Sequence, residues 1–155
     1  MVDAIQESEA VILATPYDAT GPILRENAIA LAGKIVIDAT NRLKPDLSGL
    51  SLTSDVSGAE LRQREVPSAL LFKAFNTTGF GNMRNPVYPQ GRAVMFVAGP
   101  DGKSKQTVMQ LVTDAVNAGD LTQARLLEPL AMLWIKLAFA KGFGVDCAFV
   151  LARRR

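Results

Sequence analysis

Short apolar runs recur along the chain at intervals that suit strands alternating with helices. Residues 10–15 (AVILAT) and 34–40 (KIVIDAT) are rich in β-branched side chains, and residues 70–75 (LLFKAF) and 93–98 (AVMFVA) are also apolar at neighbouring positions. Strands that are apolar on both faces are typical of parallel sheets covered by helices on both sides. The pattern therefore predicts four strands of one mostly parallel sheet.

The segments between these runs carry the signals of helices. Pro22 stands near the start, and Gly33 just past the end, of a segment whose apolar residues have helical spacing. The charged segment 59–65 predicts a second crossover helix. Residues 76–91 show no periodicity and contain proline and glycine, so we expect a long loop there. Strands and helices that alternate in this way predict an α/β fold.

Two further helices are predicted in the second half of the chain. The first begins after Gly102, with Asp101 as its expected N-cap, and its apolar face consists of Val108, Leu111, Val112, Ala115 and Val116. The second runs from about Leu126 to Lys141 and is apolar nearly all round. A helix of that kind has to be covered by another surface.

The length and charge of the chain limit the classes of protein that it can belong to. Its 155 residues have room for one domain, and 48% hydrophobic with 21% charged residues is the balance of a folded protein. The formal net charge of +2 is too small to make nucleic acid or an anionic membrane the leading partner. No run reaches the ~18 uninterrupted apolar residues of a membrane span. We therefore expect neither a nucleic-acid nor a membrane partner.

The chain contains no histidine and one cysteine, Cys147. The missing histidine excludes imidazole bases, histidine metal ligands and Ser-His-Asp triads. A lone cysteine can form no intramolecular disulfide and cannot by itself hold zinc, so a reducing compartment, the cytoplasm, is favoured. We expect the Cys147 thiol to be buried and unreactive in an apolar helical setting.

Small, hydroxyl-bearing and amide-bearing residues follow three of the predicted strands. Because ligands of open parallel sheets bind outside the carboxyl ends of the strands, these residues are binding candidates. Neutral groups of this kind can bind and orient a ligand but are not strong acids or bases near pH 7, which suits hydride transfer carried by a cofactor. The candidates are Ala14, Thr15 and Pro16 after the first strand, Thr40 and Asn41 after the second, and Ala74, Phe75, Asn76 and Thr77 after the third.

Other interpretations of these residues stay open. Threonine and asparagine at a strand end also cap loose backbone groups, and for any one of them alone this role is the more ordinary one. Asp38 could bind a ribose, or it could be a structural carboxylate that accepts hydrogen bonds from loop amides. The pair Gly79 and Gly81 is weak evidence for phosphate binding because a third glycine is missing.

An ordered series of motifs along nearly the whole chain resembles one protein family. The family is that of the NADP oxidoreductases that depend on the deazaflavin coenzyme, a group of Rossmann-type proteins that also resembles the cytosolic domain of six-transmembrane ferrireductases. The resemblance implies NADPH binding and hydride exchange with the deazaflavin coenzyme. The motifs that carry it are AVILATPYDA, LAGKIVIDATN, LFKAFNTTGFGN, MFVAGPDGKSK and ARLLEPLAMLWIKLAF.

The resemblance also implies where a ligand lies. It places the dinucleotide against Ala14, Thr15 and Pro16, continues with Thr40 and Asn41 in the next loop, and sets residues 74–77 beside the nicotinamide. The last apolar helix resembles the family's dimerising and substrate-covering element.

Compared with the family, the chain lacks the opening strand and its Gly-x-Gly-x-x-Gly turn. Residues 116–121, which connect the predicted helix to the C-terminal segment, form a shorter connection than in the family, as though a short strand had been lost. We therefore expect residues 1–120 to form the later half of a Rossmann-like domain and residues 121–155 a C-terminal helical segment. Such a truncated chain is expected to bind NADPH weakly, to be weak or inactive alone, and to form a homo-oligomer through its open sheet edge.

Two functions of different classes follow from these observations. The first is an NADP-dependent oxidoreductase that transfers a hydride between NADPH and a deazaflavin or similar acceptor, with no residue assigned as general acid or base. The second is a catalytically silent relative that acts as an oligomer or interaction module through the sheet edge and the helix 126–141. A third interpretation, a small domain that binds another mononucleotide-like ligand at the same strand ends, is weaker.

Overall fold

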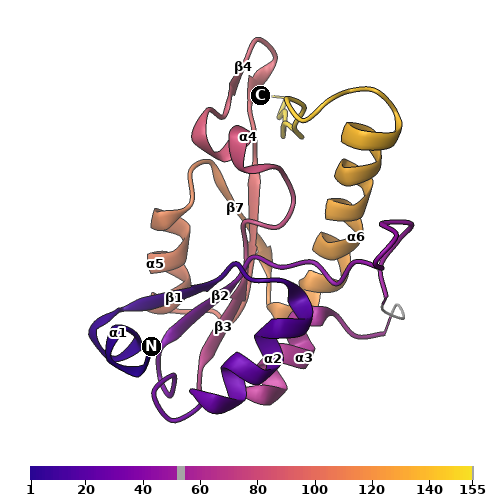
Figure 1. Cartoon of the computed structure of the whole chain (residues 1–155). Coiled ribbons are helices and arrows are strands. Elements are labelled where there is room, and N and C mark those ends of the chain that lie inside the picture. The colour runs from indigo at the N-terminus through magenta and orange to yellow at the C-terminus, as the bar shows by residue number, and fades with distance from the viewer. Residues whose placement is uncertain (52–54, 155) are drawn as a thin grey trace.

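A five-stranded sheet forms the centre of the molecule (Figure 1). The computed structural model describes residues 1–51 and 55–154. The strands stand in the order β1-β2-β3-β6-β7, so β1 and β7 are its edges, and their bounds are β1 Ala10–Leu13, β2 Ile35–Asp38, β3 Leu70–Lys73, β6 Met95–Ala98 and β7 Ala115–Gly119. The four predicted strands and the α/β fold class are confirmed.

The sheet is parallel except at one seam. β1, β2 and β3 pair in parallel, and β6 pairs in parallel with β7. Between these two groups β6 runs antiparallel to β3, and the pairing joins a single pair of residues, Lys73 and Ala98. The chain from β3 to β6 forms no crossover helix of the length that a parallel return requires. The mostly parallel sheet expected from the sequence is therefore divided into two parallel parts.

Alternate residues of the central strands enter two separate cores. Val36 and Leu71 belong to a cluster with Leu24, Ala59 and Ala124. Their sequence neighbours belong to a second cluster on the other face, in which Ile35, Ile37 and Phe72 contact Val108 and Val112. Successive side chains of a strand point to opposite faces, so a strand that is apolar at every position is buried on both sides.

Helices cover both faces of the sheet. α2 (Tyr17–Glu26), α3 (Gly58–Glu65) and α6 (Ala124–Ile135) lie on one side and α5 (Lys103–Leu111) on the other, while α1 (Val2–Glu7) leads into β1 (Figure 1). α3 was predicted almost to the residue, and it begins with a capping box in which Ser57 and Glu60 exchange hydrogen bonds. α2 begins five residues before Pro22, which lies inside the helix instead of near its start. It also ends at Glu26, and turns fill the space up to Gly33.

The segment 76–91 is more regular than the predicted loop. It contains the short helix α4 (Phe80–Arg84) and the first strand of a small hairpin, β4 (Val87–Tyr88) with β5 (Gly91–Arg92). The Asn82 side chain fixes this segment to the C-terminal tail by donating to the carbonyls of Val145 and Cys147. Elements of two to five residues are too short to show a hydrophobic period, so the sequence pattern could not reveal them.

Two expectations around α5 were wrong. Its N-cap is Gly102, and Asp101 instead accepts a hydrogen bond from Lys105 at 2.7 Å. Ala115 and Val116 belong to β7 and not to the helix, because the chain leaves helical geometry at Val112 and Asp114 has a φ of 52°. The short strand that was expected to be lost is therefore present.

The C-terminal helix lies where it was predicted. α6 continues into a π-helical turn, Lys136–Ala140, and is preceded by a 3-10 turn, Leu121–Gln123. The tail beyond it is not helical, so the expected helical setting of Cys147 is wrong, and this residue is only half-buried. No helix in the described ranges is long and apolar enough to cross a membrane. The boundary near residue 120 falls between β7 and the 3-10 turn and stays a prediction.

Candidate functional site

A cleft of about 460 Å³ opens at the carboxyl ends of β1 and β2. A volume of this size is typical of small-molecule sites. Two pairs of residues from the predicted strand ends line it, Ala14 with Thr15 and Ala39 with Thr40. The rest of the lining is mainly apolar and comes from Ile12, Phe75, Thr78, Phe80 and Met83. Pro16, the third candidate of the first strand end, is exposed and forms the N-cap of α2.

The side chains of Asn41 and Asn76 join the second and third strand ends. Asn41 Nδ2 donates to the backbone carbonyl of Asn76 at 2.9 Å, and Asn76 Nδ2 donates to Asn41 Oδ1 at 3.1 Å. Asn76 Nδ2 also donates to the carbonyl of Leu127 in α6, at 3.2 Å. The first two bonds bring together two residues that lie far apart in the sequence and were both predicted as site residues, and the third ties Asn76 to α6.

Asn76 keeps one polar atom without a partner. Its two donated bonds end on oxygen atoms, which fixes the orientation of the amide and leaves Oδ1 as the acceptor. Oδ1 is buried, and no hydrogen-bond donor in the described part of the chain reaches it. A buried acceptor without a partner is unfavourable by roughly 1–3 kcal/mol, so such an atom is a candidate acceptor for a donor from a bound molecule or a water.

The backbone next to Asn76 is strained. Phe75 has a φ of 61°, in the left-handed region that non-glycine residues rarely adopt, and its side chain lines the cleft. Strain of this kind is concentrated at binding sites, where the surrounding structure holds it in place. The neighbours Ala74 and Thr77 are almost fully buried, and Thr77 contacts the sulfur of Met95. The structure therefore does not place these two candidates on the cleft wall.

A buried ion cluster lies directly beneath these loops. Lys73 Nζ is 2.9 Å from Asp38 Oδ2 and 3.1 Å from Glu128 Oε1, and all three side chains are at most 1% exposed. Lys73 Nζ also donates to the carbonyl of Thr40 at 2.5 Å. Asp38 Oδ1 in turn accepts from the backbone nitrogen and the hydroxyl of Thr40. Of the two interpretations of Asp38, the structure matches the structural carboxylate.

Glu128 completes the cluster from α6. Its carboxylate accepts hydrogen bonds from the backbone nitrogens of Gly58 and Ala59, at 2.9 and 3.1 Å. These are the first residues of α3, where free N–H groups and the helix dipole favour a negative charge. One lysine and the start of α3 thus compensate two buried carboxylates.

Lys73 and Glu128 were not among the residues predicted from the sequence. A signal for both was present, because each is a charged residue inside an apolar stretch, in LLFKAF and in LLEPLAMLW. Such residues are seldom fully buried unless they are paired. What the sequence alone could not supply is the partner, since Asp38, Lys73 and Glu128 come from three separate elements.

Two arginines contact the ring of Tyr17, the first residue of α2. The guanidinium carbon of Arg62 is 3.9 Å from the ring centroid, and that of Arg42 is 5.5 Å away. Arg62 Nη2 also donates to the backbone carbonyl of Tyr17. Burial raises the pKa of the Tyr17 hydroxyl, and the two nearby positive charges oppose that rise. Tyr17 is therefore un-ionised near pH 7 and acts here as an aromatic surface.

The site is built for binding and orientation rather than for acid–base chemistry. The cleft wall carries methyl, hydroxyl, aromatic and thioether groups but no carboxylate, lysine or cysteine side chain. Among the described residues, no group of three or more potential ligands could hold a metal ion. The Gly79 and Gly81 pair opens a helix of only five residues.

Comparisons with known proteins identify relatives that match nearly the whole chain. No protein-family model matches the chain. It is 27% identical over 158 residues to the F420-dependent NADP reductase of Methanocaldococcus jannaschii, a match that covers 92% of this chain and 69% of that protein. A solved structure of a proposed F420-dependent NADP reductase from Arthrobacter sp. FB24 is 32% identical, with a TM-score of 0.86 over 98% of this chain and 72% of the other.

A more distant solved structure shares the fold. The imine reductase of Streptomyces aurantiacus is 20% identical and gives a TM-score of 0.62, over 90% of this chain and 46% of the other. At that level of identity the likeness concerns the arrangement of strands and helices only.

Proposed function

The chain belongs to the family of F420-dependent NADP reductases, and from this membership we propose that it binds NADP(H) and takes part in hydride exchange with a deazaflavin coenzyme. The proposed binding site is the cleft at the carboxyl ends of β1 and β2. The observation that carries the proposal is the buried Oδ1 of Asn76, an oriented acceptor without a partner among the described residues, which directly follows Phe75 of the cleft wall in the sequence. The carboxamide of a nicotinamide carries N–H donors of the kind that this atom lacks.

The residues of the cleft fit such a ligand. The apolar wall formed by Ile12, Phe75 and Met83 suits one face of a planar ring, and the hydroxyls of Thr15 and Thr40 suit polar groups at its rim. When bound, the dinucleotide supplies the hydride, so the protein has only to hold two rings in reacting geometry. The mainly apolar lining also excludes water from the ring, and the absence of acid–base groups from the wall is compatible with this chemistry.

The predicted site residues enter the proposal in different roles. We propose that Ala14, Thr15 and Pro16 lie along the dinucleotide and that Asn41 holds Asn76 in its orientation. Ala74 and Thr77 are buried, so we propose that they act by shaping the strained turn at Phe75. A cytoplasmic location remains part of the proposal, supported by the single cysteine of the chain.

Binding of NADPH to the full chain tests this proposal. Trp134 is the single tryptophan, and its ring packs against Gly79, three residues after Asn76. We expect NADPH to quench Trp134 fluorescence and to raise the melting temperature, with a dissociation constant no weaker than millimolar. Absence of both responses at several millimolar NADPH would contradict the proposal.

The role of Asn76 is tested separately. Asn76→Ala removes the Oδ1 acceptor, and we expect the dissociation constant for NADPH to rise roughly tenfold, the equivalent of one hydrogen bond. Asn85→Ala is the matched control, because Asn85 is exposed and lies at the end of α4. The melting temperature of each variant without NADPH separates loss of binding from loss of folding. Equal dissociation constants for NADPH in the two variants would contradict a role of Asn76 in binding.

A second candidate function is an oligomer or interaction module, and exposed apolar side chains favour it. Leu133 and Phe139, on α6 and its π-helical end, are 49% and 68% exposed, and Ile12 on the edge strand β1 is 53% exposed. Contiguous exposed apolar surface and unpaired sheet edges are typical of contacts with another chain. We propose self-association through α6.

Light scattering of three proteins tests self-association. We expect the wild type to be larger than one chain, and Phe139→Lys to shift it toward the monomer. Leu111→Lys serves as the control, because Leu111 is 55% exposed on α5, on the other side of the sheet. A wild type that is monomeric at all concentrations would rule out this second function.

A further inference from the structure

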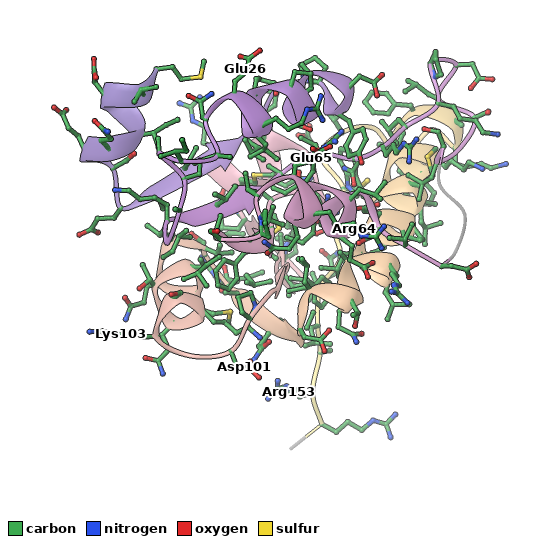
Figure 2. All side chains as sticks on the ribbon, turned by 90° about the horizontal axis from the view of Figure 1, so that it is seen from below. Glu26, Arg64, Glu65, Asp101, Lys103 and Arg153 are labelled. Atoms are coloured by element: carbon green, nitrogen blue, oxygen red, sulfur yellow. The ribbon has the colours of Figure 1, made fainter. Side chains whose placement is uncertain are left out.

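A groove of about 530 Å³ runs between α2 and α3 and shares no residue with the cleft described above. Figure 2 views the molecule from the side on which these helices lie and labels Arg64 and Glu65 on α3. Four arginines line the groove, Arg25, Arg42, Arg62 and Arg64, against the two carboxylates of Asp18 and Glu65. The lining therefore carries an excess of two positive charges in a chain whose total net charge is also only +2.

Arg62 is the buried member of this set. Its side chain is 10% exposed, and its guanidinium is held by the Tyr17 carbonyl at 2.9 Å and by Glu65 at 3.8 Å. Its Nε has no hydrogen-bond partner in the described part of the chain. The guanidinium is therefore held in a fixed position, and its positive charge lies at the groove lining.

Arg42 and Arg64 have no carboxylate partner among the described residues. Glu65 is already engaged by Arg25, at 2.7 Å, and Arg42 contacts the ring of Tyr17 instead of an acid. Arg64 is exposed on α3. These two charges are therefore available to a ligand, while the ion pair of Arg25 with Glu65 leaves one side of the groove close to neutral.

We propose that this groove binds the phosphate group of a small molecule. Guanidinium groups match the oxygen atoms of a phosphate, which can accept from two N–H groups of one arginine at once. A polar, open groove of this kind offers little to an apolar ligand. The inference does not depend on the proposed binding of NADP(H), because none of the groove's residues lines the cleft. The phosphate could belong to the dinucleotide itself or to a separate phosphorylated molecule.

Calorimetric titration of the full chain with inorganic phosphate at low ionic strength tests the proposal. We expect saturable binding with a millimolar dissociation constant, which weakens as sodium chloride is added because salt screens exposed charges. Sodium acetate under the same conditions should bind at least tenfold more weakly, since it carries a single charge and two oxygen atoms. No saturable binding of phosphate, or equal binding of acetate, would overturn the proposal.

Two variants and a control locate the bound phosphate. Arg64→Gln removes an exposed charge and should raise the dissociation constant for phosphate several-fold, and Arg42→Gln combined with it should raise that constant by more than tenfold. Arg84→Gln is the control, because Arg84 is an exposed arginine on α4, outside the groove. A control that loses as much affinity as the groove variants would show that phosphate responds only to the overall charge, and the proposal would fall.

Titrations with NADPH and NADH distinguish the two sources of the phosphate. If the groove holds the additional phosphate of NADPH, Arg42→Gln with Arg64→Gln should weaken NADPH and leave NADH unchanged. If both dinucleotides bind these variants as they bind the wild type while inorganic phosphate does not, the groove serves a separate phosphorylated molecule. Binding of inorganic phosphate without any binding of NADPH would support phosphate binding by the groove and contradict the proposed binding of NADP(H).

Discussion

Lys73 shows how single residues connect the predicted site to the rest of the fold. It is fully buried, ends β3, and lies within 3.1 Å of carboxylates from β2 and α6. Taking an ion pair out of water brings little net stability, but breaking one leaves an uncompensated buried charge. The value of the cluster therefore lies in fixing the positions of its members. Through the Thr40 carbonyl, Lys73 holds one of the loops that form the cleft.

Replacing Lys73 by methionine should therefore be strongly destabilising. Lys73→Met leaves Asp38 and Glu128 buried without their cation, and we expect the free energy of unfolding in urea to fall by about 3–5 kcal/mol. The triple variant, which combines Lys73→Met with Asp38→Asn and Glu128→Gln, removes all three charges of the cluster. Its free energy of unfolding should fall by less than that of Lys73→Met alone. A triple variant that is less stable than the single one would show that the hydrogen bonds, and not the charges, are decisive.

Glu60 makes stability depend on pH in the acid range. Hydrogen bonds from Arg125 lower the pKa of the Glu60 carboxyl from 4.5 to about 2. Since the pKa is lower in the folded state, the ionised group stabilises the fold above about pH 4.5, and this contribution is lost as the pH falls toward 2. Its size should be about 1–2 kcal/mol, because Arg125 is largely exposed to solvent.

Urea denaturation at pH 7 and pH 3 measures that contribution. We expect Glu60→Gln to cost about 1–2 kcal/mol at pH 7 and clearly less at pH 3. Asp46 offers a comparison, because its carboxyl also has a lowered pKa, caused mainly by hydrogen bonds from Ser48, but is exposed. Asp46→Asn should change stability little at either pH. An effect of Glu60→Gln that is independent of pH would contradict this account.

At the scale of elements, the close contact between β3 and β6 depends on a glycine. A Cβ atom added to Gly99, directly after β6, would lie 2.2 Å from Cδ1 of Phe72, which is fully buried in β3. Neither the backbone nor a ring packed in the core can move far enough to relieve this overlap. The contact explains why the chain has a glycine where the apolar strand ends.

Gly99→Ala should destabilise the protein by about 2–3 kcal/mol or more through overpacking. The matched control is Gly81→Ala in α4, where an added Cβ has no atom within 4 Å and alanine favours the helix. Thermal unfolding of the two variants measures the difference. Equal melting temperatures of the two variants would mean that β6 can move away from Phe72 without a loss of stability.

The elements that the sequence predicted are those with a long hydrophobic signal. The apolar strands and the capped helix α3 are recognisable from local residues, as is α6. The failures have local physical causes. β7 was missed because Ala115 and Val116 continue the helical spacing of α5, although the chain leaves helical geometry at Val112 and Asp114 is left-handed. The reversal of β6 was missed because strand direction depends on the path of the intervening chain.

At the scale of the whole molecule, the sequence predicted which strand ends come together, but it did not predict how their side chains are placed. Thr15 and Thr40 line one cleft, and Asn41 contacts Asn76, because the carboxyl ends of parallel strands meet at one edge of the sheet. The sequence could not reveal which of these groups face the cleft. Asn76 Oδ1 and the strain at Phe75 depend on three-dimensional packing, as does the Asp38–Lys73–Glu128 cluster.

The single residue pair between β3 and β6 bears on how the molecule opens. In their backbone pairing, β1 to β3 form one group and β6 with β7 form the other, and one residue pair joins the two groups, while side chains such as Phe72 and Val97 share one core across that pair. Regions joined by a weak seam can open separately in the native state. Amide hydrogen exchange should then give one opening free energy for β2 and a lower one for β6 and β7. A single value for all strands would show that side chains such as Phe72 make the two parts one cooperative unit.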